Sequence, residues 1–470
     1  MYNMIIKDAK IRHELDELFR VFIKPVEFVY RENRQDADPD AIIIEYPSAL
    51  TDLDEIKRNL YETMSFQTGY KPPWGILTGV RPTKKCNDYL TAGMPETAVR
   101  KRLIHDFYVS ADKTDLILET CRNQKKINQM DTQKLVGIYI GIPFCPSRCT
   151  YCSFASNEFN QTQIDLYLTA LFQEIDYVSL MLKELGLFPE SIYFGGGTPT
   201  ALSEGDLDRL LSKVRENFDF DKVKEFTVEA GRPDTITIKK LESILKYGGT
   251  RISINPQSMN QKTLQIIGRN HTPASIIEAF NMAASVGIPV INADIIAGLP
   301  EEDIQDFMLT VEQVLRLQPQ NITVHTLAMK RASKLKAMDK DYQYDSHASL
   351  AAMLTHSRAS LNDQGYKPYY LYRQKQTAGN FENVGYARGD TQGIYNVRIM
   401  EERQSIIALG AGGISKVYFP LENRHERVPN VSDLHHYITR IQEMIKRKEA
   451  FIARPLSGLI TEKTEVAHAD

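Results

Sequence analysis

Apolar and polar positions alternate regularly through the middle of this chain. Six short runs rich in β-branched and aliphatic side chains predict strands at 136–142, 191–194, 225–230, 250–254, 290–296 and 321–326. Between the first two strands, apolar residues return at helical spacing and predict one long helix with a single buried face, made of Ile164, Leu168, Leu171, Ile175 and Leu182.

Each later strand is followed by a second helical pattern. We expect helices to begin near Ser203, Asp234, Gln261, Thr272 and Pro300. Thr272 is a predicted N-cap, and Pro273 stands at the first position of the helix that follows. Gly287 predicts the end of that helix. Six β-α units with largely apolar strands predict a parallel sheet covered by helices. The expected fold class is therefore α/β, with a (β/α)6 partial barrel whose working face lies at the C-terminal ends of the strands.

The rest of the chain has a different pattern on either side of this core. Residues 1–120 mix helical and strand patterns and predict a separate N-terminal α+β domain, which includes the unusual segment Lys71–Lys84. Residues 122–134 indicate a linker or surface helix. We expect this core to span 136–335, and residues 336–470 to form a C-terminal extension that covers a substrate.

Composition excludes several classes of protein. The chain has 470 residues and a net charge of −3, which gives no overall electrostatic footprint for nucleic acid. It contains no apolar run near the roughly 20 residues that span a bilayer, and its start lacks the pattern of a signal peptide. Five cysteines, three of them clustered, fit a reducing compartment. We expect a cytoplasmic protein that has no membrane span and is monomeric.

The cysteine cluster carries the strongest chemical information. Cys145, Cys149 and Cys152 follow the first predicted strand directly. Three thiolates at this spacing suit a [4Fe–4S] cluster with three ligated irons and one open iron, which can bind a small ligand. The alternatives are a zinc clip completed by a distant histidine, or three buried thiols. The spacing is similar to that of the radical S-adenosylmethionine (SAM) superfamily.

Polar residues at the ends of later strands add to this picture. The loop Gly195–Thr198 follows the second strand, where glycines allow close approach of backbone and ligand and can present amide groups. Glu229 ends the third strand, and a carboxylate there needs a partner, either a salt bridge or a ligand. Gln257, Arg269 and Asp294 lie at or beyond the ends of later strands and complete a polar ring around one end of the barrel.

Several motifs in order resemble the oxygen-independent coproporphyrinogen III oxidase family. They are the segment Tyr139–Cys145, the cysteine triad, the loop Gly195–Thr200, Glu229, the segment Arg251–Gln257 and the segment Gly298–Pro300. The segment Trp74–Lys84 is similar to a signature of a Gram-positive, coproporphyrinogen dehydrogenase-like branch. The resemblance implies that Cys145, Cys149 and Cys152 ligate the cluster and that Tyr139 lies beside it, near SAM or substrate. It implies that SAM is contacted by Gly196, Gly197, Thr198, Glu229, Gln257, Arg269, Asp294 and Ala328.

Two positions depart from the decarboxylating members of this family. Those members carry a cysteine where this chain has Phe154 and a histidine where it has Gly141. A phenylalanine after the third cysteine is instead common in the related haem chaperones. Those chaperones carry a His-Asn-x-x-Tyr-Trp segment, and the nearest equivalent here, Tyr395-Asn396, lacks the histidine and the tryptophan.

The resemblance implies a radical SAM enzyme of porphyrin synthesis. It would convert coproporphyrinogen III to protoporphyrinogen IX by oxidative decarboxylation of two propionates, with electrons from a donor such as flavodoxin or ferredoxin. The alternatives are a haem-binding chaperone and a radical SAM enzyme that acts on another porphyrin. Four cations are candidates to meet the substrate carboxylates or are solvated surface charges, namely Lys330, Arg331, Arg373 and Lys375.

Overall fold

A six-stranded parallel sheet forms the core of the protein. The computed structural model describes residues 2–6, 8–23, 28–38, 40–45, 52–79, 81–132, 134–152, 160–328, 347–374 and 380–449. The core strands lie side by side in chain order, as β4 (Leu135–Ile142), β5 (Phe188–Gly196), β6 (Glu225–Glu229), β7 (Arg251–Gln257), β8 (Val290–Ala297) and β9 (Asn321–Thr326). All six strands occur where the apolar runs predict them, and the α/β partial barrel is confirmed.

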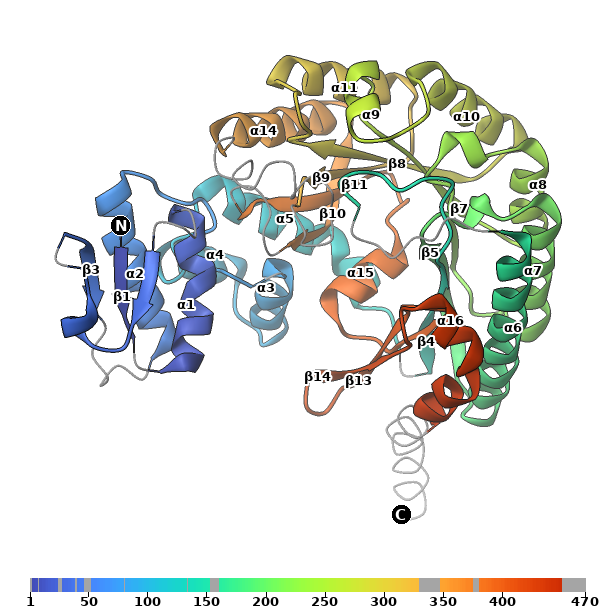
Figure 1. Cartoon of the computed structure of the whole chain (residues 1–470), viewed down its shortest axis with the longest axis horizontal. Helices are drawn as coiled ribbons and strands as arrows, with labels where there is room; N and C mark the ends of the chain where they lie inside the picture. The colour runs from blue at the N-terminus through green and yellow to red at the C-terminus, as the bar shows by residue number, and fades with distance from the viewer. Residues whose placement is uncertain are drawn as a thin grey trace, which may run out of the picture.

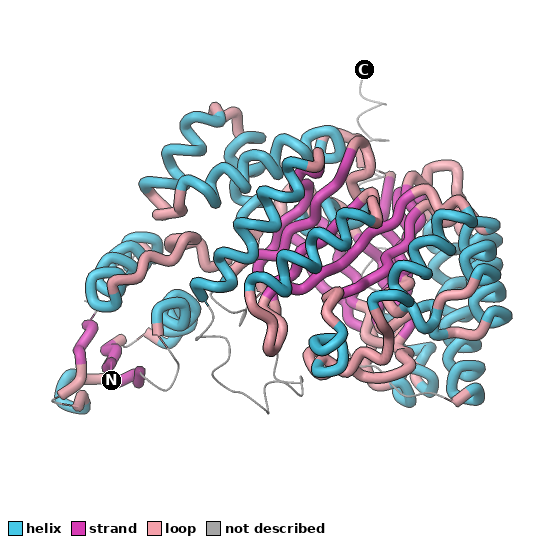
Figure 2. Tube along the Cα trace, turned by 90° about the horizontal axis from the view of Figure 1, so that it is seen from above, coloured by secondary structure: helices cyan, strands magenta, loops and turns pink. Residues whose placement is uncertain are grey.

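Helices cover the outer face of this sheet (Figures 1 and 2). They are α6 (Gln161–Glu184), α7 (Glu204–Asn217), α8 (Ile238–Lys246), α9 (Gln261–Ile266), α10 (Pro273–Val286) and α11 (Ile304–Arg316). Thr272 caps α10 through a reciprocal capping box, and Gly287 ends it with φ of 85°, as the sequence indicates. Helix α11 begins four residues after Pro300, because the Asp303 carboxylate accepts the amides of Gln305 and Asp306.

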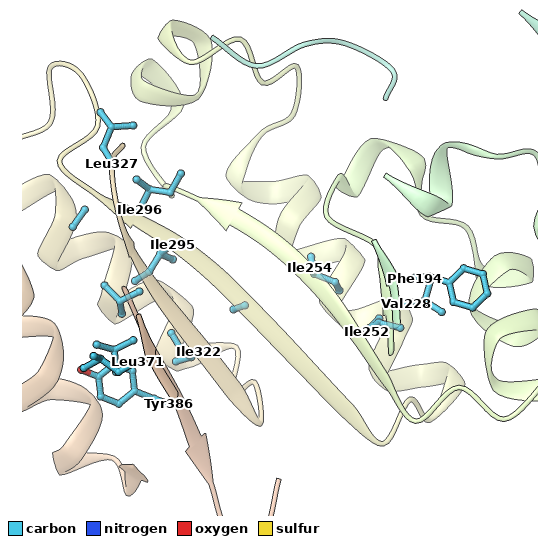
Figure 3. Close-up of a cluster of buried hydrophobic side chains, with 14 of the residues drawn as sticks. Phe194, Val228, Ile252, Ile254, Ile295, Ile296, Ile322, Leu327, Leu371 and Tyr386 are labelled. Carbon is cyan, nitrogen blue, oxygen red and sulfur yellow. The ribbon is translucent and has the colours of Figure 1, made fainter. Parts of the chain in front are cut away.

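Side chains along the core strands alternate between two environments. Phe194, Val228, Ile252 and Ile322 point toward the helices and are fully buried or nearly so (Figure 3). The residues between them in sequence face the barrel interior and are polar, and they bond to one another across strands, as Asn292 does to Ser253. The interior of this barrel is therefore a polar site rather than a packed apolar core.

C-terminal residues extend the core sheet at both edges. At one edge β12 (Ile406–Leu409) pairs parallel to β4 and is followed by the antiparallel strands β13 (Ile414–Phe419) and β14 (Arg424–Pro429). At the other edge β11 (Glu382–Arg388) pairs antiparallel to β9, and β10 (Tyr366–Arg373) pairs with β11. The sheet thus has eleven strands within the described residues. The extension is part of the sheet, and its expected role in covering substrate stays a prediction, as do the domain boundaries.

Helix α15 (Ile394–Glu401) closes the barrel at the N-terminal ends of the strands. The Glu225 carboxylate, at the first residue of β6, accepts the amides of Ile394 at 2.6 Å and Tyr395 at 3.3 Å. Arg398 forms a buried two-bond ion pair with Glu190 of β5, at 2.9 and 3.2 Å. Access to the barrel interior is therefore left to the opposite end, where the strands finish.

Residues before the barrel form a three-stranded parallel sheet and a group of helices beside it (Figure 1). The strands are β1 (Tyr2–Ile5), β2 (Phe28–Arg31) and β3 (Ile42–Glu45), and the helices are α1 (Ala9–Phe22), α2 (Leu53–Thr68), α3 (Pro82–Thr91), α4 (Glu96–His105) and α5 (Ala111–Asn128). The predicted surface helix at 122–134 is the end of α5. Two more helices, α14 (His347–Asp363) and α16 (Leu434–Thr439), lie against the barrel. In the described part of the chain, no helix is both long and apolar enough to cross a bilayer.

The Trp74 segment joins this N-terminal part to the barrel edge. The Trp74 indole donates to Glu382 of β11 at 2.8 Å, and the Arg373 guanidinium lies 5.0 Å from the centre of the Trp74 ring. Arg373 is buried and donates to the carbonyls of Leu77 and Asn380. Its expected place at a substrate entrance is therefore wrong. The other three candidate cations, Lys330, Arg331 and Lys375, lie outside the described residues.

Candidate cluster and cofactor site

The cysteine loop leaves the barrel at the C-terminal end of β4. Phe144 anchors its start, because its ring is buried edge-on against Tyr167 with centroids 5.3 Å apart. Cys149 is buried, whereas Cys145 and Cys152 are half-buried, and all three are free thiols. The three sulfurs therefore lie on one short loop at the open end of the barrel.

The glycine loop after β5 holds the cysteine loop through its backbone. The amides of Gly197 and Thr198 donate to the carbonyls of Ile142 and Phe144, both at 2.7 Å. A Cβ atom on Gly197 would lie 2.4 Å from the Phe144 oxygen, so no other residue fits there. These two amides are already bonded within the chain, so the expectation that they are presented to a ligand is wrong. The Thr198 hydroxyl lies 3.4 Å from the Cys145 sulfur, which places the loop directly beside the first cysteine.

Arg269 holds the cysteine loop from the other side. Its guanidinium donates to the carbonyls of Gly231 and Asn255 at 2.8 Å, and to the Tyr151 hydroxyl at 3.1 Å. The residue before Tyr151, Thr150, donates its amide to Ile267 at 3.0 Å. The Arg269 Nε is buried and lacks a hydrogen-bond partner among the described residues. Arg269 thus positions the loop and keeps one donor that a bound cofactor could use.

Arg232 is a site residue that sequence reasoning missed. It is 3% exposed, pairs with Asp234 at 3.0 Å and donates to the Ser147 hydroxyl at 3.1 Å. The same guanidinium lies 4.0 Å from the Cys149 sulfur. A buried cation at this distance favours the thiolate form that iron requires. The sequence does carry one signal for Arg232, because this residue follows Gly231 in the turn directly after the strand that ends at Glu229.

Glu229 points into the barrel interior and is held by a tyrosine. The Tyr193 hydroxyl donates to its carboxyl oxygen at 2.6 Å. Burial raises the pKa of the Glu229 carboxyl to about 7, the charge of Asp294 acts in the same direction, and the Tyr193 hydrogen bond opposes both. The salt bridge considered for Glu229 is not found among the described residues. Glu229 is therefore a buried acid that exchanges its proton near neutral pH.

Tyr139 belongs to a stack of three tyrosines inside the barrel. Its ring is stacked with those of Tyr193 and Tyr395, at centroid distances of 6.2 and 6.3 Å, and the latter two are 4.4 Å apart. Tyr395 comes from α15, so the stack rises from the closed end of the barrel toward Glu229. Its aromatic faces form the floor beneath the open end.

Asp294 occupies the far wall of the same interior. Asn292 donates to its carboxylate at 2.7 Å, and the His325 ring nitrogen lies 3.7 Å away. Burial alone would raise the Asp294 pKa, but hydrogen bonds from His325 and Asn292 outweigh it and lower that pKa. Asp294 is thus ionised at a pH where Glu229 holds its proton, as in enzymes that separate the roles of two carboxyl groups.

The remaining predicted positions mark the rim of the barrel. Gln257 ends β7 with φ of 65°, a left-handed conformation that is uncommon for a non-glycine residue and is often found at functional sites. Ala328 is half-buried just after β9. Gly141 faces inward beside Tyr139, and a Cβ there would meet its neighbours no closer than 3.4 Å. Phe154 lies outside the described residues.

These residues fit the cofactors that the cysteine spacing implies. Three thiols on one loop, a buried arginine beside Cys149 and an unused donor on Arg269 suit an anionic cluster and its ligand. Among the described residues, no three His, Cys, Asp or Glu side chains lie close enough together to hold a single metal ion. The Cys residues would hold the [4Fe–4S] cluster, and Glu229 and Asp294 offer hydrogen-bond partners for SAM.

The chain is similar to known radical SAM proteins. The radical SAM superfamily matches residues 139–314. The chain is 37% identical over 406 residues to the oxygen-independent coproporphyrinogen-III oxidase-like protein HemZ of Bacillus subtilis (strain 168), and the match covers 85% of this chain and 80% of that protein. It is 28% identical to the heme chaperone HemW of Lactococcus lactis, over 71% of this chain and 85% of the chaperone.

A solved structure shares the fold. The coproporphyrinogen III oxidase HemN from Escherichia coli, described as a radical SAM enzyme, superposes with a TM-score of 0.54 at 24% identity, over 69% of this chain and 73% of that one. The family match covers the cysteine loop and the strands that carry Glu229 and Asp294. The chain therefore belongs to the oxygen-independent coproporphyrinogen III oxidase-like family of the radical SAM superfamily, whose members use a [4Fe–4S] cluster and SAM.

Proposed function

We propose that this protein converts coproporphyrinogen III to protoporphyrinogen IX by oxidative decarboxylation without oxygen. The observation that carries the proposal is the pair of carboxyl groups inside the barrel, Glu229 and Asp294, which have unlike pKa shifts and lie on strands of the same barrel that carries the cysteine loop. The similarity to a coproporphyrinogen-III oxidase-like protein, which covers 85% of this chain, supports the same substrate class. The proposal includes a porphyrinogen substrate and an external one-electron donor such as flavodoxin or ferredoxin.

Different residues of the chain would have different roles around the bound cofactors. When bound, the cluster and SAM supply one-electron chemistry that activates an unreactive C–H bond. Asp294 would accept hydrogen bonds from polar groups of SAM, while Tyr193 fixes the orientation of the Glu229 carboxyl. Helix α15 closes the barrel floor and keeps water from reaching the site from below. The polar interior of the barrel would thus bind and orient SAM and the substrate. Glu229 would hold a proton inside the same space.

A second candidate is a haem chaperone. The 28% identity to a heme chaperone favours it. The presence of Gly141, where decarboxylating members carry a histidine, favours it as well. Such a protein would bind haem through the same open end and transfer it without decarboxylation.

One experiment separates the two functions. Anaerobically reconstituted protein is incubated with SAM, a reductant and coproporphyrinogen III, and the products are identified by mass. We expect loss of two CO₂ per porphyrinogen together with 5′-deoxyadenosine. Stoichiometric haem binding without SAM cleavage would replace the proposal with the chaperone, and SAM cleavage with a different tetrapyrrole product would point to another porphyrin substrate.

A further inference from the structure

A cluster of cations lies at the closed end of the barrel, away from the cysteine loop. We call it the α3 basic cluster, and it consists of Arg81, Lys84, Lys416, His425 and Arg427. A single carboxylate, that of Glu402, accepts from Arg81, from Lys84 at 3.5 Å, from Lys416 at 3.3 Å and from the His425 ring at 3.2 Å. Lys416 pairs with Ile406, the first residue of β12, and Ile406 lies beside Gly137 near the start of β4. The cluster is therefore at the opposite end of the strands from Cys145.

Positive charge is in excess here. The side chains of Arg81, Lys84 and Lys416 are only 18%, 20% and 13% exposed. Burial raises the pKa of the adjacent Glu401, whose carboxyl group accepts from Asn87 and forms no ion pair with these cations among the described residues. Burial together with the charge of Arg81 lowers the pKa of Lys416 to about 8, although Glu402 opposes this. Partly buried charge without a counter-charge is costly, so the site as it stands is short of negative charge.

Strands β13 and β14 contribute two of these cations, and the repulsion between them would be reduced by a bound anion. Lys416 and Arg427 are directly opposite one another in the β13–β14 register, and like charges so placed destabilise a sheet. Arg427 is exposed, and no residue in the described ranges forms an ion pair with it. Glu402 is therefore the one carboxylate found with Lys416 among the described residues, and Arg427 adds a positive charge on the neighbouring strand.

The N-terminus of helix α3 also favours a bound anion. It begins at Pro82, lacks a side-chain cap at Arg81 and has no acidic residue in its first turn. Cations at a helix N-terminus oppose the helix dipole, whereas an anion there is stabilised by it. The Arg81 Nε is buried and has no hydrogen-bond partner within the described residues. The helix end, Arg81 and the opposed strand cations thus each favour added negative charge in this region.

We propose that the α3 basic cluster is a binding site for a phosphate group, either inorganic phosphate or the phosphate of a small molecule, separate from the cluster and SAM site. Two arginines provide forked donors that match phosphate oxygens, and two lysines supply charge. A dianionic group is favoured over a single carboxylate, because Glu402 already contributes one negative charge and an excess remains. The site does not depend on the proposed reaction.

Calorimetry on the reconstituted full chain tests the site, with inorganic phosphate and pyrophosphate as probes in a low-chloride buffer. We expect saturable binding at one site. Lys416→Gln and Arg427→Gln should each weaken it by at least about fivefold. Lys126→Gln is the matched control, because this lysine is 70% exposed and forms a surface pair with Asp390 on another part of the molecule. No saturable heat, or equal affinity in all three variants, would overturn the proposal.

Glu402→Gln should change phosphate affinity in the opposite direction to Lys416→Gln and Arg427→Gln. Removal of the resident carboxylate should tighten phosphate binding, lower the thermal midpoint without phosphate and enlarge the rise in midpoint that phosphate produces. A purely structural role for Glu402 would lower the midpoint with no gain in phosphate affinity. Weaker phosphate binding in this variant would also contradict the site.

Discussion

At the scale of single residues, the state of Glu229 follows from what surrounds it. A buried carboxyl usually keeps its charge through an arginine or lysine, but the partner that the structure shows is the Tyr193 hydroxyl. The nearest charge acting on it is the like charge of Asp294. The folded protein therefore holds a proton on Glu229 at a pH where the unfolded chain would release it.

This proton predicts a measurable dependence of stability on pH. A raised pKa in the folded state means that the stabilisation is complete below the unfolded value of 4.5 and is lost as pH rises to about 7. The change is on the order of 3 kcal/mol. We expect Glu229→Gln to remove it, so that the thermal midpoint of the variant rises relative to that of the parent between pH 5.5 and pH 8. An unchanged difference between the two pH values would show that Glu229 is ionised throughout.

The three cysteines predict the iron content directly. Cys145→Ala should lose most of the iron and the brown absorbance, because a cubane cluster with two protein thiolates is held weakly. Cys86→Ala is the matched control, since Cys86 is a buried free thiol far along the chain from the loop. Iron and absorbance are measured after anaerobic reconstitution. Full iron content in Cys145→Ala, or stoichiometric zinc in the parent protein, would contradict the assignment.

At the scale of helices and strands, α15 is held to the barrel by buried charge. Burial would raise the Glu190 pKa, but the Arg398 ion pair outweighs it and lowers that pKa. Gln404 adds a hydrogen bond to Glu190 at 2.7 Å. The closed end of the barrel thus depends on one carboxylate and the side chains that meet it.

Removing one partner of this pair should cost more than removing both charges. Arg398→Met leaves the buried Glu190 carboxylate with Lys224 at 3.1 Å and Gln404 as its remaining partners, at an expected cost of about 3 kcal/mol. Adding Glu190→Gln should restore part of the loss, because the buried charge that has lost its main partner disappears. Thermal midpoints of both single variants and the double variant measure the coupling. A double variant less stable than Arg398→Met would argue against this account.

The elements differ in how far the sequence predicts them. The six core strands and helix α10 follow from local patterns, the apolar runs and the Thr272, Pro273 and Gly287 signals. Strand β12 has only four residues, and its pairing with β4 joins segments about 270 positions apart, so no local pattern predicts it. The plug formed by α15 depends on Glu190 and Arg398, which are 208 residues apart.

The same limit applies within the site. Cysteine spacing predicts the position of Cys145 and a strand-end position predicts that of Glu229, whereas Asp294 lies within β8, three residues before its end, and faces the interior through the alternation of the strand. The role of Arg269 in holding the cysteine loop, and the place of Arg232 beside Cys149, depend on how two loops fold against each other. Such contacts are set by tertiary packing, which local pattern does not encode.

At the scale of the whole molecule, the N-terminal part is tied to the barrel by a small buried cluster. The carboxylate of Glu382 on β11 accepts from the Trp74 indole at 2.8 Å and from Lys113 at 2.5 Å. Burial would raise the Glu382 pKa, but Lys113 and Trp74 outweigh it and lower that pKa. This carboxylate therefore joins helix α5 and the Trp74 segment to the sheet edge.

Trp74 is the chain's single tryptophan, so its fluorescence reports on this junction alone. In the parent protein, we expect urea unfolding followed by Trp74 fluorescence to coincide with unfolding followed by far-UV circular dichroism. Glu382→Gln leaves buried Lys113 with only the longer 3.8 Å contact to Asp112, so the junction should open first and the fluorescence transition should move to lower urea. Glu96→Gln, which alters only an exposed pair with Arg122, should leave the two transitions together. Coincident transitions in Glu382→Gln would mean that the N-terminal part and the barrel unfold as one unit regardless of this carboxylate.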